Sequence, residues 1–403
     1  MPPRARFHEV TAQPVIAVEQ PDTQTTRVFT LPSGKIREFI DALMSATDHF
    51  IAPTRSMHED LVFAEVESAD EVELEYENAL ISPACFVLPQ REAVFTYAMA
   101  EGEPPEVRAA ADVESHIIFG VRPCDVAAIE YLDRFFMGGE FADDVYARRR
   151  EAKTIVAMAC VEPQNDACWC TCSNAGPVAA SGYDLQLTLM DDVYIVESGS
   201  ERGDRLIDVA HELLADADPE LVEQRKQRVE DAFETFERRG NIAQAMRWIS
   251  GDQTPEELWE ELGAKCFSCG SCSLVCPVCS CFDTHEYVED GVGARIRCWD
   301  SCHFPGYSLE ASGFNPREDE AERMFHYAHH KLCADTFQKY GRPGCVGCGR
   351  CVQVCSAQID LPRIAQTIRE CGWACKDCKS CPSADMTAAP AGVPAGAEGT
   401  DDD

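Results

Sequence analysis

Two short cysteine runs have the spacing that holds iron–sulfur clusters. Each run has gaps of two, two and three residues, as in the bacterial ferredoxin motif, where the fourth cysteine ligates the other cluster of a pair. The first run consists of Cys266, Cys269, Cys272 and Cys276. The second run consists of Cys345, Cys348, Cys351 and Cys355. Pro277 follows the first run as usual, whereas Ser356 takes the place of proline after the second.

We therefore expect two [4Fe–4S] clusters with exchanged fourth ligands. Two-residue gaps fold three thiolates around one cluster, and the fourth cysteine is expected to open a helix that points away. The first cluster is then expected to use Cys266, Cys269, Cys272 and Cys355. The second is expected to use Cys345, Cys348, Cys351 and Cys276. Zinc is the alternative, but it prefers separated Cys-x-x-Cys pairs over runs of four.

A further thiol group is predicted in the N-terminal part of the chain. Cys124 follows the apolar segment 115–121, and Cys160 ends the apolar segment that begins at Thr154. With the helical pattern at 125–136 between them, these segments predict a parallel β-α-β unit whose carboxyl edge carries both thiols. Cys168 and Cys170 follow in one short loop. The four thiols could bind a third [4Fe–4S] cluster; the alternative is buried cysteine without metal.

A last cysteine motif lies near the C-terminus, just after an expected helix at 361–370 that Asp360 can cap. It consists of Cys371, Cys375, Cys378 and Cys381. Part of its spacing is that of radical S-adenosylmethionine enzymes, but segment 383–403 is too short and polar to build their barrel. We favour a fourth [4Fe–4S] cluster, with zinc as the alternative because four thiolates suit either metal.

Other candidate residues allow less specific interpretations. The thiols of Cys279, Cys281, Cys298 and Cys302 could ligate another metal or pack around the ferredoxin-type clusters and tune their potential, and we favour the second reading. The segment 329–331, His-His-Lys, is expected to be an exposed helix end. Because the chain has no G-x-G-x-x-G or Walker loop and no nucleophile–base motif, we identify no catalytic residue and no nucleotide or flavin site.

The composition excludes several classes of function. The net charge of −35 argues against binding to nucleic acids, which requires a basic surface, and against an anionic membrane surface. The chain has no apolar run long enough to span a membrane, and no apolar signal segment follows its N-terminus. We expect a cytoplasmic protein, a compartment in which most of its 23 cysteines would stay reduced and available to metal.

These patterns predict an α+β protein: an α/β-like N-terminal domain, followed by a mainly helical, bacterial-ferredoxin-type dicluster domain. The first domain is expected at 1–204 and includes a β-hairpin at 185–196. A helical bridge is expected at 205–263, with its last helix capped by Thr254 and stopped by Gly263. The dicluster domain should occupy 264–370, the extra cysteine motif 371–382, and a disordered acidic tail 383–403.

The combination of motifs resembles one protein family. The resemblance lies in segments 119–125 (FGVRPCD), 168–170 (CWC), 276–283 (CPVCSCFD) and 299–302 (WDSC). These segments are similar to those of the iron–sulfur subunits of sulfhydrogenases (β subunit) and of anaerobic sulfite reductase (A subunit), over roughly residues 30–365. In that family Cys124, Cys160, Cys168 and Cys170 fall on typical positions, whereas Cys298 and the motif at 371–381 are departures.

The resemblance implies an electron-transfer subunit of an anaerobic redox complex. Such a subunit relays single electrons between a flavin- and nicotinamide-binding subunit and a catalytic subunit of the hydrogenase or sulfite reductase type. It is expected to carry at least two [4Fe–4S] clusters, with three or four favoured, and not to be catalytic alone. The alternative is a scaffold stapled by zinc that transfers no electrons.

Overall fold

An eight-stranded mixed sheet organises the N-terminal part of the protein. The computed structural model describes residues 27–99, 106–109, 113–240, 242–289 and 291–371. The strand order is β10-β1-β9-β8-β7-β6-β2-β3, and the neighbours β8-β7-β6-β2 run parallel. The strands are β1 (Val28–Pro32), β2 (Phe50–Arg55), β3 (Leu61–Glu65), β6 (His116–Val121), β7 (Lys153–Met158), β8 (Leu185–Met190), β9 (Val193–Ser198) and β10 (Ala215–Asp216).

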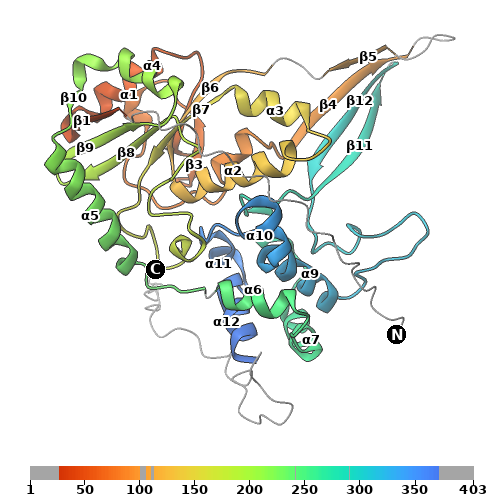
Figure 1. Cartoon of the computed structure of the whole chain (residues 1–403). Helices are drawn as coiled ribbons and strands as arrows, with labels where there is room; N and C mark the ends of the chain where they lie inside the picture. The colour runs from red at the N-terminus through yellow and green to blue at the C-terminus, as the bar shows by residue number, and fades with distance from the viewer. Residues whose placement is uncertain (1–26, 100–105, 110–112, 241, 290, 372–403) are drawn as a thin grey trace, which may run out of the picture.

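Helices cover both faces of this sheet because its central strands are apolar on both sides. On one face, α1 (Ile36–Met44) and α4 (Glu201–Val209) pack against side chains such as Phe119 and Val156. On the other face lie α2 (Pro123–Met137) and α3 (Asp144–Glu151), which pack against the opposite side chains of the same strands, such as Ile118 and Ile155 (Figure 1). The β-α-β unit and the hairpin of β8 and β9 thus form as the sequence predicts.

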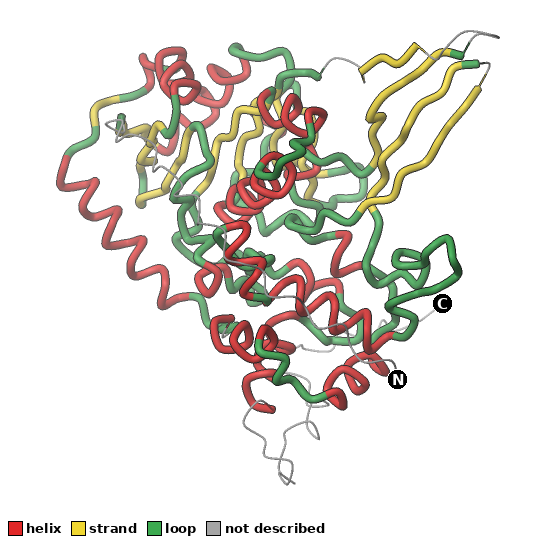
Figure 2. The backbone as a smooth tube through the Cα atoms, turned by 45° about the vertical axis from the view of Figure 1, so that its right-hand side comes forward, coloured by secondary structure: helices red, strands yellow, loops and turns green. Residues whose placement is uncertain are grey.

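A second, four-stranded sheet projects from the body of the molecule, with strand order β11-β12-β4-β5 (Figure 2). Its strands are β4 (Arg91–Ala98), β5 (Glu106–Ala109), β11 (Phe282–Glu289) and β12 (Val292–Trp299). The hairpin of β11 and β12 lies within the region that the sequence assigns to the mainly helical dicluster domain, yet it pairs with β4 from the N-terminal part. The two parts of the chain therefore share this sheet.

A third layer of helices lies beneath the large sheet (Figure 1). It consists of α6 (Ile242–Ser250), α7 (Glu256–Lys265), α8 (Ser271–Leu274), α9 (Glu320–Leu332), α10 (Ala334–Tyr340), α11 (Arg350–Val354) and α12 (Leu361–Cys371). Their shared core includes Leu262, Met324 and Ile364, and Trp169 enters it from the N-terminal part. The helix α5 (Pro219–Thr235) instead runs beside β8 and β9, where Arg225 hydrogen-bonds to Thr188 and Glu197. No helix in the described ranges is long and apolar enough to cross a membrane.

Two local predictions for α7 were wrong. Pro255, not Thr254, stands at the N-cap, and the Thr254 hydroxyl instead accepts a hydrogen bond from Trp259. Gly263 does not stop the helix, which continues to Lys265. A Cβ atom at Gly263 would lie 2.6 Å from the backbone nitrogen of Ala321, so the glycine lets α7 and α9 approach closely.

A buried ion pair joins the large sheet to the cysteine-rich part. Arg350, at the start of α11, donates 2.7 and 2.9 Å hydrogen bonds to the two carboxylate oxygens of Asp125 in the first turn of α2. Arg350 also donates to the carbonyl of Ala79, and the Ser82 hydroxyl donates to Asp125. Both charged side chains are fully buried, so the loss of either partner leaves an uncompensated charge in the interior.

Removing the charge of Asp125 should therefore destabilise the whole protein. We expect Asp125→Asn to cost about 3–5 kcal/mol, because Arg350 stays buried without its counter-ion. The matched control is Glu223→Gln, which removes a carboxylate from an exposed pair with Lys226 and should cost at most about 1 kcal/mol. Denaturant unfolding of the anaerobically purified chain measures both. Equal costs for the two variants would contradict the role of this ion pair.

Candidate metal centres

The two ferredoxin-type runs fold into loops with the same backbone pattern. The residue before the second cysteine and the residue after it both have positive φ in each loop. These residues are Ser268 (50°) and Gly270 (72°) in the first loop, and Gly347 (63°) and Gly349 (84°) in the second. In both loops the first cysteine sulfur accepts a backbone N–H bond, from Ser268 at 3.4 Å and from Gly347 at 3.3 Å. Because the two loops share this backbone conformation, we expect each of them to enclose the same kind of metal centre.

The first site lies at the protein surface. Its four predicted thiols line one hollow, together with apolar side chains such as Met324 and Ile359. The thiols are Cys266, Cys269, Cys272 and Cys355. Cys269 is exposed and its neighbour Phe267 is 73% exposed, so this site is accessible to a partner. Burial, together with the smaller effect of the thiols of Cys266 and Cys355, raises the pKa of Cys272 to about 12.

The second site lies deeper in the protein. Cys276, from the first run, lies close enough to Cys345, Cys348 and Cys351 to raise the pKa of each of them, in addition to the larger effect of burial. Lys331 donates a 3.2 Å hydrogen bond to the Cys276 sulfur. The structure therefore brings together both predicted sets of ligands, with the fourth cysteine of each run in the other set.

The fourth cysteine of each run reaches the other loop by a different local structure from the one predicted. We expected each to open a helix, but each follows a short one: Cys276 comes after α8, and Cys355 is the C-cap of α11. These two helices pack against each other. Each helix carries the chain away from its own loop, so the cysteine behind it meets the opposite loop.

The four predicted thiols of the N-terminal part also meet. They line one hollow beside Cys348 of the second site, and they are Cys124, Cys160, Cys168 and Cys170. Cys124 lies in the first turn of α2, and Cys160 follows β7, so both stand at the carboxyl edge of the sheet as predicted. Burial raises the pKa of all four thiols, so thiolates here need a metal ion or a cation beside them.

Arg122 supplies one such cation. Its guanidinium stacks on Tyr76 at 3.9 Å and lowers the pKa of Cys160, against the larger effect of burial. The Nε atom of Arg122 is buried and has no hydrogen-bond partner. The guanidinium also hydrogen-bonds to Cys160, and a cation in this position favours an anionic group bound by the thiols.

The second and third sites are in direct contact. The backbone nitrogen of Trp169, between Cys168 and Cys170, donates a 2.9 Å hydrogen bond to the carbonyl of Gly347. A Cβ atom at Gly347 would lie 2.7 Å from the Cys170 backbone, so only glycine permits this approach. Asn78 lies between the sites: its amide nitrogen donates to the Cys348 carbonyl at 3.1 Å and lies 3.9 Å from the Cys168 sulfur.

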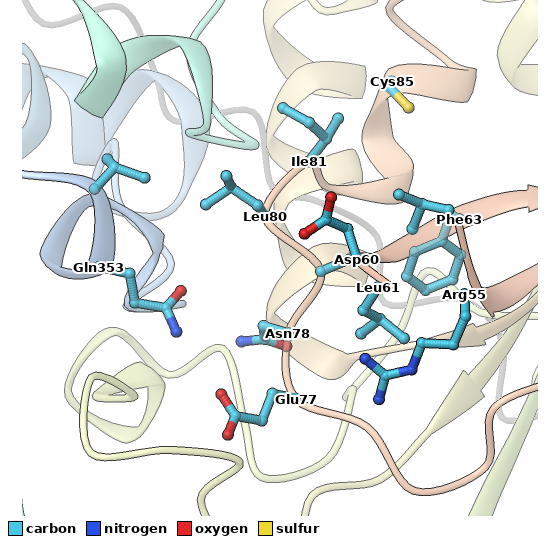
Figure 3. A pocket seen from close by; sticks show the side chains of 13 residues that line it. Arg55, Asp60, Leu61, Phe63, Glu77, Asn78, Leu80, Ile81, Cys85 and Gln353 are labelled. Carbon is cyan, nitrogen blue, oxygen red and sulfur yellow. The ribbon is translucent and has the colours of Figure 1, made fainter. Parts of the chain in front are cut away.

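Asn78 also forms part of a groove between the N-terminal part and α11 (Figure 3). Apolar side chains such as Leu61, Leu80 and Ile81 line it, and Gln353 lies at its α11 side (Figure 3). The side-chain oxygen of Asn78 is buried without a hydrogen-bond partner. The groove therefore runs from the protein surface to Asn78, which lies between the second and third sites.

The thiol arrangement suits iron–sulfur clusters better than single zinc ions. Four sulfurs about 2.3 Å from one zinc lie roughly 3.8 Å apart. Among the described residues, no three cysteine sulfurs all lie within 4.8 Å of one another. The group of side chains that does meet this limit consists of His49, Glu114 and His116. The thiols are thus more widely spread, as expected when each binds a different iron of one cluster.

The histidine group does not suit a metal. The ammonium of Lys153 lies 2.7 Å from Nδ1 of His116. The same Nδ1 lies 3.0 Å from the carbonyl oxygen of Glu114, so both of its contacts are made within the protein. The positive charge of Lys153 beside the group disfavours a metal cation there.

The other predicted cysteines have separate outcomes. Cys279 hydrogen-bonds to Cys276, and a hydrogen bond from Cys302 lowers the pKa of Cys281 to about 6. These thiols lie next to the ferredoxin-type ligands, which is the arrangement of our favoured interpretation, whereas Cys298 lies in β12 opposite Asp283. For the C-terminal motif, Cys371 ends α12, and Cys375, Cys378 and Cys381 lie outside the described residues.

Sequence reasoning missed the charged residues around the sites. Lys331, expected at an exposed helix end, is only 4% exposed. A signal was present, since Lys331 follows Met324, Tyr327 and Ala328 at seven, four and three residues, and those side chains form the buried face of α9. The Asp125–Arg350 pair and Asn78 had no comparable signal, because their partners are distant in sequence.

The comparison with known families defines the class of protein. Residues 265–359 match the family described as "4Fe-4S dicluster domain". The protein is therefore an iron–sulfur protein with at least two [4Fe–4S] clusters in a mixed α/β fold.

A comparison with individual proteins agrees with the predicted resemblance. The chain is 29% identical over 310 residues to Sulfhydrogenase 2 subunit beta from Pyrococcus furiosus. The alignment covers 76% of this chain and 89% of that subunit. The similarity to sulfhydrogenase β subunits that the motifs predicted is thus confirmed, and it extends well beyond the dicluster domain.

The exchange of ligands can be tested with two reciprocal variants. We expect Cys276→Ser to alter the second cluster and Cys355→Ser to alter the first, because each cysteine lies with the opposite loop. EPR spectra of the dithionite-reduced chain and its iron content measure the effect. Cys269→Ser and Cys348→Ser, which remove an unexchanged ligand from each cluster, assign the two signals. A Cys276→Ser spectrum that matches the Cys269→Ser spectrum would rule out the exchange.

Proposed function

We propose that the chain is the electron-transfer iron–sulfur subunit of an anaerobic redox complex. It relays single electrons between a flavin- and nicotinamide-binding subunit and a catalytic subunit of the hydrogenase or sulfite reductase type. The observation that carries this proposal is the row of three thiol groups, the first exposed at Cys269 and the second in contact with the third through Trp169 and Gly347. The similarity to a sulfhydrogenase β subunit supports the same role.

The residues of the chain have distinct tasks in this proposal. When bound, [4Fe–4S] clusters accept and release single electrons at potentials that the protein sets. Cys266, Cys269, Cys272 and Cys355 hold the first; Cys345, Cys348, Cys351 and Cys276 hold the second; Cys124, Cys160, Cys168 and Cys170 hold a third. Apolar packing excludes water from the second and third sites, whereas Phe267 presents the first site to a partner. The groove beside Asn78 offers a second approach, near the opposite end of the row.

The predicted division of the chain belongs to this proposal. Residues 1–204 supply the third site, 205–263 form the helical bridge, and 264–370 supply the ferredoxin-type pair. The segments 371–382 and 383–403 are proposed as an additional cluster motif and an acidic tail. The cytoplasm remains the expected location.

The relay requires iron at three sites in the described part of the chain. We expect the anaerobically purified full chain to absorb visible light and to bleach with dithionite, whereas a zinc scaffold would be colourless. The double variant Cys160→Ser/Cys170→Ser should lose about four irons per chain, since it removes half of the ligands of one cluster. Metal analysis and absorption spectra measure both effects.

The matched control for this variant is Cys85→Ser. Cys85 is a partly buried cysteine beside the groove and outside the three thiol groups, so its loss should leave the iron content unchanged. An unchanged iron content in the double variant would exclude the third cluster. Tight flavin or NAD(H) binding by the purified chain, or turnover of a substrate, would contradict the relay role itself.

A fourth cluster is proposed for Cys371, Cys375, Cys378 and Cys381. The helix α12 starts at Leu361, where Asp360 accepts a 3.0 Å hydrogen bond from the backbone of Arg363, and it carries the chain from Cys355 to this motif. A chain that ends after Glu370 should lack about four irons and keep the EPR signals of the ferredoxin-type pair. Loss of zinc with unchanged iron would instead make the motif a structural zinc site.

A further inference from the structure

Lys331 places a buried ammonium group against the second site. The side chain is 4% exposed, and its Nζ atom donates a 3.2 Å hydrogen bond to the sulfur of Cys276. Its position is rigid because the end of α9 packs on the loop before Cys345. A Cβ atom at Gly344 would lie 2.6 Å from the carbonyl oxygen of His330 and 3.2 Å from the Cα atom of Lys331.

The positive charge of Lys331 interacts mainly with the surrounding thiols. The thiols of Cys276, Cys279 and Cys345 and the phenol of Tyr131 surround its ammonium group. Among the described residues, no carboxylate is one of these main neighbours. Arg350, the other cation near the second site, is instead neutralised by its bidentate pair with Asp125.

The first site has no comparable cation. No lysine or arginine lines its hollow. Within the described chain, its thiols hydrogen-bond with the backbone N–H groups of Ser268 and Ile359 and with the hydroxyl of Ser271. The first site is also the more exposed of the two, since Cys269 is open to solvent and the thiols of the second site are more buried. The two ferredoxin-type sites therefore stabilise negative charge by different means: solvent at the first and Lys331 at the second.

We propose that Lys331 raises the reduction potential of the second cluster. Reduction adds one negative charge to a cluster, and a charge in a low-dielectric interior is unfavourable unless a counter-charge is near. The net charge and hydrogen bonds at the sulfurs are among the factors that set cluster potentials. Lys331 keeps the buried second cluster reducible by the exposed first one. This inference rests on the proposed relay.

The test compares variants that keep or remove the charge. In the full, anaerobically purified chain, Lys331→Met and Lys331→Gln should lower the potential of the second cluster. We expect the reduction equilibrium constant to fall at least tenfold, which is 59 mV for a one-electron couple. Lys331→Arg should retain the wild-type potential. EPR-monitored redox titration measures the potentials, and the signal lost in Cys348→Ser identifies the second cluster.

The control is Lys265→Met. Lys265 directly precedes the ligand Cys266, but it is partly exposed and paired with Glu261, so its loss should leave both potentials almost unchanged. An unchanged potential in both uncharged variants would overturn the role of Lys331. Loss of the second cluster in both would also overturn it, since Lys331 would then be structural. Absence of iron–sulfur signals from the wild-type chain would refute the proposed relay instead.

Discussion

The bidentate pair of Asp125 and Arg350 determines how the two halves of this protein fit together. Asp125 lies one residue after Cys124 of the third site, and Arg350 lies between Cys348 and Cys351 of the second. Each ion would be costly to bury alone, so the low-dielectric interior tolerates both only in this arrangement. The pair therefore constrains the distance between two thiol groups that are far apart in the sequence.

Near this pair, the two halves of the protein approach so closely that a side chain at the contact would clash with the backbone. Gly347 lets the second loop lie against Trp169 and Cys170, and Trp169 continues into the core of the helical layer. The hairpin of β11 and β12 pairs with β4 and adds a second connection between the halves. Arg297 on β12 strengthens it with ion pairs to Glu92 and Asp143. A relay gains from such rigidity because its steps depend on fixed distances between sites.

Charge is distributed unequally between surface and interior. The chain has a net charge of −35, yet the cations closest to the buried thiols are Lys331, Arg122 and Arg350. Thiolates and clusters are anionic, so they require compensation where water is excluded. The first site is open to solvent at Cys269, whereas the buried thiols of Cys276 and Cys160 lie beside Lys331 and Arg122.

The sequence by itself determined the cysteine motifs and the β-α-β unit that carries Cys124 and Cys160. These follow from local spacing and periodicity, because loop curvature and strand ends depend on neighbouring residues. The exchange of fourth ligands between the two loops stays a prediction from the ferredoxin-type spacing. The sequence also indicated the similarity to sulfhydrogenase β subunits. Only the tertiary structure decided that β11 and β12 join β4, that Gly263 allows close helix contact, and that the Lys331 ammonium meets the Cys276 sulfur. Those outcomes depend on partners far away in the chain, such as Ala321 for Gly263 and Cys276 for Lys331, which no local pattern can specify.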